Sequence, residues 1–242
     1  MGRTAGSLWL SRFELNPRNK KAQQDLRDCQ KMFETLLAGF GGGSRQKHNL
    51  LHRVEARGDG RAFVLVQSTT EPNWDHLRGL GDGGYLRSNG QPNPAVKDVS
   101  FVLEKVRDGM DLAFLLKANA TRREWKTGKR CPHRAWRNQM EWLARKAKEC
   151  GFKPLVVHAT QDVFDVDARP AGKVEGYREV TPDEKKKGAE KDRHRLTFEG
   201  VTYHGRLQVT DAAHFRKALM TGVGPGKAYG FGLLSVRPLG SA

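Results

Sequence analysis

The sequence contains few cysteines and no long apolar run. Its 242 residues include three cysteines, Cys29, Cys131 and Cys150, and none belongs to a Cys-x-x-Cys pair. This pattern speaks against a disulfide framework and a structural zinc site, and it fits a reducing compartment. No stretch approaches the roughly 18 uninterrupted apolar residues of a membrane span. We therefore expect no integral membrane segment and no membrane partner.

The N-terminus lacks the pattern of a secretory signal. Its short apolar patch is interrupted by Arg12 and Glu14, well short of the roughly 7–15 apolar residues that export requires. Together with the unpaired cysteines, this absence predicts a cytoplasmic protein.

Acidic residues are scarce relative to basic ones. The chain has 27 Asp+Glu against 43 Lys+Arg, a formal charge of +16. Such an excess attracts polyanions, of which nucleic acid is the commonest in a cytosol, although a soluble enzyme can also be basic. The histidines and carboxylates show no metal-ligand spacing. We expect a nucleic-acid partner, no metal and no other cofactor.

The periodicity of the first half predicts a β-α-β-β order. Strands are expected at residues 8–15, 49–56 and 62–69, with an amphipathic helix over residues 20–40. The turn-type sequence Arg57-Gly58-Asp59-Gly60 joins the last two strands as a hairpin. This order is three-quarters of the split βαβ pattern of ferredoxin-like and RRM-like folds.

The second half is expected to repeat this α+β theme. Strands are expected at 99–106, 110–118, 155–166 and 232–236, and helices at 137–148 and from Asp211 to Gly222. Residues 169–195 are expected to form a charged, hairpin-like region. Residues 196–209 are expected to form two paired strand segments with a bend near Gly200 or Gly205. Two compact α+β halves follow, with a boundary near residues 120–150.

The most distinctive local feature is a glycine-rich segment near the C-terminus. It holds five glycines in the eleven residues from Gly222 to Gly232. Gly224 and Gly226 let the backbone approach an anion, Lys227 adds a charge, and Tyr229 offers a ring on which a base can stack. Ala228 stands where a P-loop needs a hydroxyl. A tight helix-to-strand connection explains the glycines equally well.

Two basic clusters suggest nucleic-acid contacts. The first comprises Arg122, Arg123, Lys126, Lys129 and Arg130 around Trp125, and the second comprises Lys185, Lys186, Lys187, Lys191, Arg193 and Arg195. A run of charges is often only a solvated face. With the net charge of +16, RNA contact is the better interpretation for at least one cluster.

A set of short segments runs in order through nearly the whole chain. It comprises Leu8-Trp9-Leu10-Ser11, Leu15-Asn16-Pro17, Arg27-Asp28 with Met32, Val64-Leu65-Val66-Gln67, Glu71-Pro72-Asn73-Trp74, residues 116–120, the basic residues 122–130, Phe198-Glu199-Gly200, Gly205-Arg206-Leu207 and the glycine-rich residues 222–239. Together these segments resemble the CasE family, the CRISPR-repeat RNA endonucleases of type I-E Cascade complexes.

The resemblance implies a fold, an activity and partners. It implies two tandem ferredoxin-like (RRM-like) domains, residues 1–125 with the catalytic helix position and residues 126–242 with the glycine-rich loop. It also implies binding of the CRISPR repeat hairpin and metal-independent cleavage at the 3′ base of its stem, through attack of a 2′-hydroxyl on the adjacent phosphate. The product crRNA stays bound, and the protein joins the other Cascade subunits.

One position departs from the family pattern. Phe33 stands where the family has a histidine that acts as general acid/base, and phenylalanine cannot transfer a proton. Three explanations remain open: an inactive version made to trap RNA, a natural binding-only member, or a substitute base such as His48 or His52. Phe33 can also simply pack in the core. The alternative function is a structural RNA-binding protein without repeat specificity.

Overall fold

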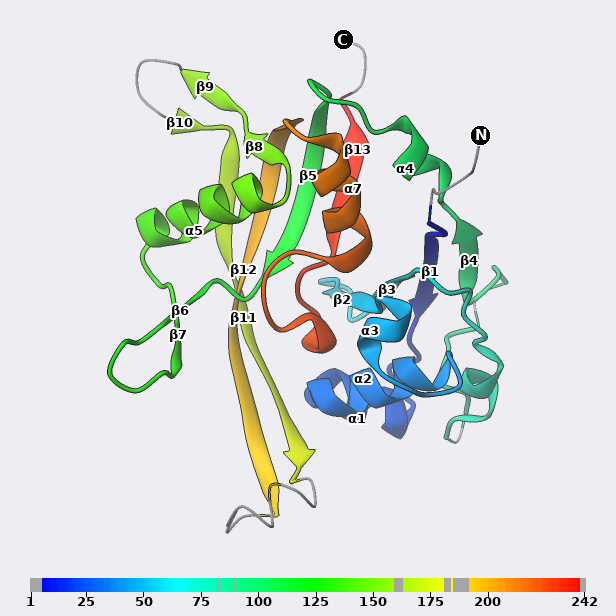
Figure 1. Cartoon of the computed structure of the whole chain (residues 1–242). Helices are drawn as coiled ribbons and strands as arrows, with labels where there is room; N and C mark the ends of the chain where they lie inside the picture. The colour runs from blue at the N-terminus through cyan, green and yellow to red at the C-terminus, as the bar shows by residue number, and fades with distance from the viewer. Residues whose placement is uncertain are drawn as a thin grey trace.

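The computed structural model describes residues 6–81, 83–88, 90–158, 163–180, 184 and 192–239. Two antiparallel sheets lie side by side, each with helices on one face (Figure 1). Within the described part of the chain, no helix is long and apolar enough to cross a membrane.

The N-terminal sheet has the strand order β2-β3-β1-β4. Its strands are β1 (Trp9–Glu14), β2 (Leu51–Ala56), β3 (Ala62–Ser68) and β4 (Ala95–Asp98), and its helices are α1 (Lys20–Arg27), α2 (Cys29–Ala38) and the short α3 (Arg45–His48). This is the ferredoxin-like order, in which the third strand lies between the first and the second. A loop containing the 3-10 helix η1 (Asp75–Gly79) replaces the second helix.

The predicted helix over residues 20–40 is two helices separated at Asp28. The backbone of Asp28 is extended, with φ −126° and ψ 106°, and its side chain accepts hydrogen bonds from the N–H groups of Gln30 and Lys31. An aspartate that caps the following helix in this way ends the preceding one. Residues 29–38 therefore form a separate helix, which carries Phe33.

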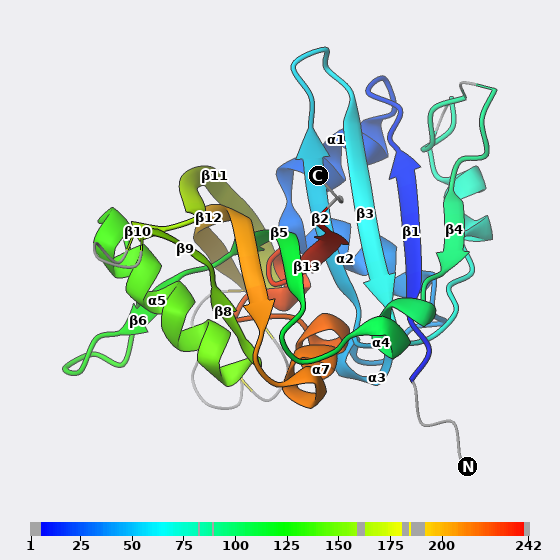
Figure 2. The same cartoon turned by 90° about the horizontal axis from the view of Figure 1, so that it is seen from above.

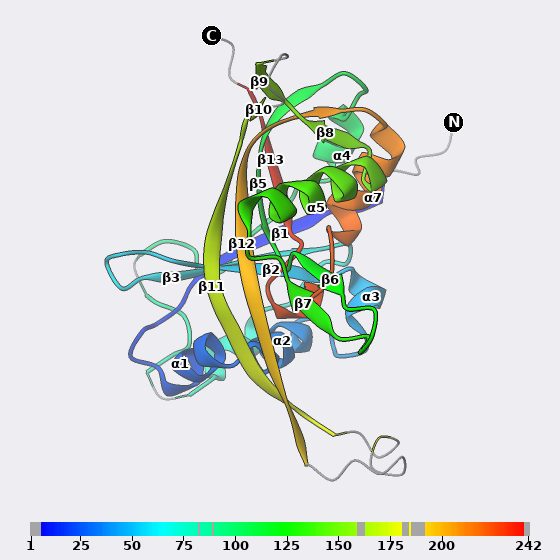
Figure 3. The same ribbon diagram turned by 90° about the vertical axis from the view of Figure 1, so that its left-hand side faces the viewer.

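The C-terminal sheet repeats the same order as β11-β12-β5-β13, with β8 also paired to β12. Its strands are β5 (Asp111–Ala118), β8 (Phe152–Pro154), β11 (Val166–Glu179), β12 (Arg193–Val209) and β13 (Leu234–Pro238), and its helices are α5 (Trp136–Glu149) and α7 (Ala212–Thr221). Both halves thus have the ferredoxin-like arrangement, which confirms the predicted fold class. Figure 3 shows β11 and β12 as one long curved ribbon that reaches α1 and α2.

Smaller elements complete the second half. They are α4 (Phe101–Lys105), the hairpin of β6 (Thr121–Arg123) and β7 (Arg130–Pro132), the pair β9 (Val156–His158) and β10 (Val163–Phe164), and the 3-10 helix η2 (Lys227–Tyr229). Figure 2 shows β13 next to β2, where the two sheets meet. Arg53 on β2 joins them, because its Nη1 donates to the Ser235 hydroxyl at 3.0 Å.

Each sheet has its own core. Leu112, Phe114 and Leu116 alternate along β5 and are buried in the core that α5 and α7 cover. Phe13 and Met32 belong to the second cluster, in the N-terminal half. Burial of these apolar faces, worth about 25 cal/mol per Å² removed from water, drives the two halves to form.

Further sequence predictions differ from the structure. The strand expected at 99–106 is wrong, because residues 101–105 form α4 and bury Leu103 and Val106 in the C-terminal core. The break expected within 196–209 is wrong, because β12 is continuous. Since β5 lies in the C-terminal sheet, a boundary drawn between the sheets falls between β4 and β5, before the predicted division at residues 125 and 126.

Candidate nucleic-acid interface

The glycine-rich segment forms the loop between α7 and β13. Its backbone has positive φ at Gly224 (+77°) and Gly226 (+81°), a conformation that residues with a Cβ rarely adopt. A Cβ on Gly224 would also lie 2.8 Å from the buried ring of Trp142. The geometry of this connection therefore requires glycine, as the structural interpretation of the sequence proposed.

The same loop offers groups suited to an anion. Among the hydrogen bonds of the described residues, none is donated by the backbone N–H of Gly224 or Gly226. Lys227 lies beside them, and partial burial together with the charge of Arg45 lowers the pKa of its ammonium group. Free N–H groups next to a cation form the kind of nest that holds phosphate. A phosphate contact at Gly224, Gly226 and Lys227 stays a prediction.

A groove of about 560 Å³ runs beside this loop, and we call it the basic groove. Its cations are Arg130 at the start of β7 in the β6–β7 hairpin, Arg145 and Lys146 on α5, Lys217 on α7, and Lys227. Among the described residues that line the groove, the carboxylate paired with a lysine or arginine is Glu149. It binds Arg145 at 3.0 Å and Lys146 at 2.5 Å. Arg130, Lys217 and Lys227 have no carboxylate partner among the described residues. The basic groove therefore keeps a positive charge.

The β6–β7 hairpin rises from the edge of the basic groove. It carries the whole first basic cluster, with Arg122, Arg123 and Arg130 on its strands and Lys126 and Lys129 in its turn. All residues from 122 to 130 are exposed. Their proposed contact with RNA stays a prediction that this position favours. Lys185, Lys186 and Lys187 of the second cluster lie outside the described residues.

Sequence reasoning missed three groove residues, Arg145, Lys146 and Lys217. They come from two helices that are far apart in the sequence and that packing brings together around the loop. The sequence signalled part of this set. Arg145 and Lys146 lie between the core positions Leu143 and Ala147 of α5, so the helical period places them on the side of the helix away from the core.

Phe33 faces the glycine-rich loop from the opposite domain. Its half-buried ring lies 6.5 Å from the ring of Tyr229, which stacks on Phe198 of β12 at 5.0 Å. The structure thus brings together two predicted site positions that are far apart in the sequence. Desolvation raises the pKa of the Tyr229 hydroxyl. The side chain at position 33 contributes packing and no proton-transfer group.

His48 is held as a structural residue. Its ring is buried and stacks on Phe40 at 4.9 Å. Its Nδ1 lies 3.1 Å from the Thr70 hydroxyl and its Nε2 lies 3.2 Å from the carbonyl oxygen of Gly42. With both ring nitrogens engaged, His48 has no free position from which to transfer a proton to a bound ligand.

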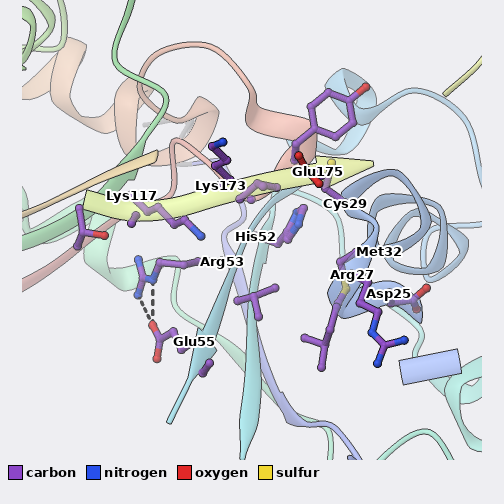
Figure 4. Close-up of a pocket in the computed structure, with 18 of the residues that line it drawn as sticks. Asp25, Arg27, Cys29, Met32, His52, Arg53, Glu55, Lys117, Lys173 and Glu175 are labelled. Atoms are coloured by element: carbon purple, nitrogen blue, oxygen red, sulfur yellow. Dashed lines mark hydrogen bonds and ion pairs between the residues drawn. The ribbon is translucent and has the colours of Figure 1, made fainter. Parts of the chain in front are cut away.

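His52 lies in a different environment, a cavity of about 980 Å³ between the two halves. Figure 4 shows His52 and Lys117 entering this cavity, with Arg53 bound to Glu55. The ring of His52 is buried, and its Nδ1 has no hydrogen-bond partner among the described residues. Burial, followed by the charge of Lys117, lowers the pKa of His52 to about 3. His52 is therefore neutral at physiological pH.

This buried neutral histidine predicts a pH-dependent stability. In the unfolded state the His52 imidazole regains its ordinary pKa of about 6.5. Below that pH, and above the pKa of the folded state, only the unfolded state binds the proton, so stability falls as pH falls. When the pH is lowered from 7 to 5, we expect the unfolding free energy of the unmodified protein to fall by about 2 kcal/mol more than that of the His52→Phe variant. Urea unfolding at both pH values measures this, and equal losses would contradict the assignment.

The described residues contain no group of three or more His, Cys, Asp or Glu side chains placed to hold a metal ion. Independence of metal stays a prediction.

Comparison with known proteins gives consistent matches over nearly the whole chain. A family model described as CRISPR associated protein matches residues 8–238. The CRISPR-associated endoribonuclease Cse3 of Thermus thermophilus is 34% identical in an alignment of 239 residues that covers 96% of this chain and 100% of that protein.

Solved structures agree with this match. A structure of Cse3 bound to a 19-nucleotide RNA covers 96% of this chain and 100% of its own, with a TM-score of 0.75 and 32% identity. Thermus thermophilus Cse3 with an RNA that represents a pre-cleavage complex gives a TM-score of 0.73 at 31% identity, with 96% and 100% covered. Cas6e from Escherichia coli K-12 shares the fold. It is 22% identical, with a TM-score of 0.58, and the match covers 96% of this chain and 100% of its own.

Proposed function

Because the chain belongs to the family of CRISPR-associated proteins, we propose that it binds the hairpin of a CRISPR repeat RNA and stays on the crRNA as a subunit of a Cascade complex. The Thermus thermophilus relative Cse3 is an endoribonuclease, and solved structures show Cse3 with RNA. The observation that carries the proposal is the basic groove next to the glycine-rich loop, with three cations that have no carboxylate partner within the described ranges.

The basic groove suits double-stranded RNA for a physical reason. A-form RNA hides its base edges in a deep, narrow major groove, so proteins recognise it mainly through phosphates and shape. Cations from two helices, a loop and a hairpin supply phosphate contacts along such a surface. The carboxylate Glu149 is already neutralised by two of these cations, so it does not repel the RNA.

The glycine-rich loop connects the basic groove to position 33. Gly224 and Lys227 line the basic groove, whereas Tyr229 lies against Phe33. An RNA stem held in the basic groove would therefore end close to position 33. This placement agrees with cleavage at the base of a stem, the reaction that the family resemblance implies.

We propose that cleavage by this chain is slow. In the implied reaction a 2′-hydroxyl attacks the adjacent phosphate, a 2′,3′-cyclic phosphate forms, and a 5′-hydroxyl leaves. One group must accept the proton of the 2′-hydroxyl and another must protonate the leaving oxygen, steps that contribute roughly 10²–10⁴-fold. Phe33 can do neither.

An active endoribonuclease that uses another base is the second candidate function. The observation in its favour is the Nδ1 of His52, which has no hydrogen-bond partner in the part of the chain that the structure describes and lies in the cavity beside Gly230 of the glycine-rich loop. A pKa of about 3 makes His52 a weak base, because general bases act best with a pKa near the working pH. His52→Phe in a cleavage assay tests this candidate, which predicts loss of any activity present.

Binding of a repeat hairpin is the direct test of the proposed function. We expect the hairpin to outcompete a stem of equal length and unrelated sequence, which would bind equally to a structural RNA-binding protein without repeat specificity. The logarithm of the affinity should fall with the logarithm of the salt concentration by about 0.7–0.9 per phosphate neutralised. Fluorescence anisotropy measures both, and an affinity independent of salt would contradict the proposal.

The proposed location is the cytoplasm, where such an RNA would be processed. The free thiols of Cys29, Cys131 and Cys150 are compatible with its reducing conditions.

A further inference from the structure

Trp125 lies at the tip of the β6–β7 hairpin and is the most exposed of the five tryptophans. Its side chain is 98% exposed, compared with 56% for Trp136, while Trp74 and Trp142 are buried. An indole normally buries roughly 150–250 Å² of surface, which makes it one of the most strongly hydrophobic side chains. The fold of this chain therefore gives Trp125 no structural role.

The turn that presents Trp125 is held by its own hydrogen bonds. The N–H of Glu124 donates to the carbonyl of Lys129, and the N–H of Gly128 donates to the carbonyl of Glu124, both at 2.9 Å. The Thr127 hydroxyl donates to the Glu124 carboxylate at 2.6 Å. The indole is thus displayed on a defined turn.

The surroundings of Trp125 select its partner by charge. Arg122, Arg123, Lys126, Lys129 and Arg130 flank it, and Glu124 is the one acid in this stretch. An apolar protein surface would have to accept these five cations, whereas a polynucleotide supplies phosphates for the cations and a base for the ring. Bases inside an A-form stem are stacked on one another, so an exposed indole can reach only an unpaired base.

We propose that Trp125 stacks on an unpaired nucleobase of the RNA held in the basic groove. Thr121 at the base of the hairpin and Arg130, which pairs with Arg123 next to the turn, line the basic groove, so Trp125 stands two to four residues, about 7–13 Å, beyond these groove residues. That reach places the indole beside the loop of the hairpin RNA or beside the single strand that flanks its stem. This inference rests on the proposed function and adds a base-contacting residue to it.

Stacking and phosphate contact differ in their response to salt, and this difference tests the proposal. We expect Trp125→Ala to weaken hairpin binding about 10- to 100-fold and to leave the slope of log affinity against log salt unchanged. Arg123→Ala should lower that slope by about 0.7–0.9, since it removes a phosphate contact. Trp125→Phe should retain most of the affinity. Phe101→Ala is the matched control, because Phe101 is an exposed aromatic residue (52%) on α4, distant from the hairpin in Figure 1.

Two further measurements identify the base. RNA binding should quench tryptophan emission, and Trp125→Phe should abolish most of that quenching. Hairpins with abasic nucleotides, either in the loop or in the flanking strand, should show which replacement removes the sensitivity to Trp125→Ala. If the wild-type protein does not bind the hairpin, the proposed function fails. If the wild-type protein binds and Trp125→Ala binds equally well, the stacking proposal alone is overturned. The same holds if Trp125→Ala weakens binding of both abasic RNAs as much as it weakens binding of the intact hairpin.

Discussion

Phe33→His is expected to cleave the repeat hairpin at the 3′ base of its stem at least about 10²-fold faster than the unmodified protein. The substitution places an imidazole on the face of α2 that lies against Tyr229 and the glycine-rich loop. Position 33 is half-buried and not in the tightly packed interior, so a slightly smaller polar ring can be accommodated. An imidazole with a pKa near about 6.5 exists in both protonation states near neutral pH and can serve either proton transfer.

The assay compares four proteins with labelled repeat RNA in EDTA. Glu34→His is the matched control, because Glu34 is exposed on the same helix and its side chain binds Gln30 and Lys31 instead of facing the loop. Phe33→Ala controls for the removal of the phenyl ring. We expect rapid product formation only with Phe33→His. Cleavage by the unmodified protein at a similar rate would show that another residue transfers the proton, and His52→Phe would then be the next variant to test.

The repeated α+β fold could be predicted because its main signals are local. Alternating apolar residues mark β5, and the period of three to four marks α5. The prediction failed where long-range packing decides the outcome. Gly205 suggested a bend in residues 196–209, yet β12 continues through it, paired with Val166 on one side and Phe114 on the other. Glycine is required there because a side chain would collide with the carbonyl group of Asp165. The sequence shows a glycine but not which neighbour requires it.

The candidate site was predictable only in its local parts. The glycine-rich loop and the basic hairpin are contiguous in the sequence, so their composition indicated them directly. The sequence could not separate His48 from His52. Only the fold shows that two acceptor or donor groups engage the ring of His48, while the Nδ1 of His52 has no partner among the described residues. Lys217 likewise joins the basic groove only through the packing of α7.

Removal of Arg130, Lys217 and Lys227, the groove cations without a carboxylate partner among the residues that the structure describes, should have the largest effect on binding. For the triple variant Arg130→Ala, Lys217→Ala and Lys227→Ala, we expect the salt slope to fall by about 2–3. Each lost contact lowers the salt slope by about 0.8, which costs about 0.8 log units of affinity for each tenfold decrease in salt below 1 M. At 0.1 M salt, the loss of three contacts therefore weakens binding by about 2.4 log units, or about 250-fold. Lys217 is exposed and the other two are not in the core, so the fold should persist, which circular dichroism checks.

A control with the same loss of charge separates local contact from general attraction. Arg18, Lys20 and Lys97 are exposed in the N-terminal half, away from α5 and α7, and have no carboxylate partner among the described residues. Their triple alanine variant lowers the net charge equally but leaves the basic groove intact. We expect it to change the affinity by less than about threefold, because charges beyond the Debye length of about 10 Å at 0.1 M salt are screened. If both triple variants lost affinity equally, the RNA would be attracted by net charge, and the basic groove would not be its binding site.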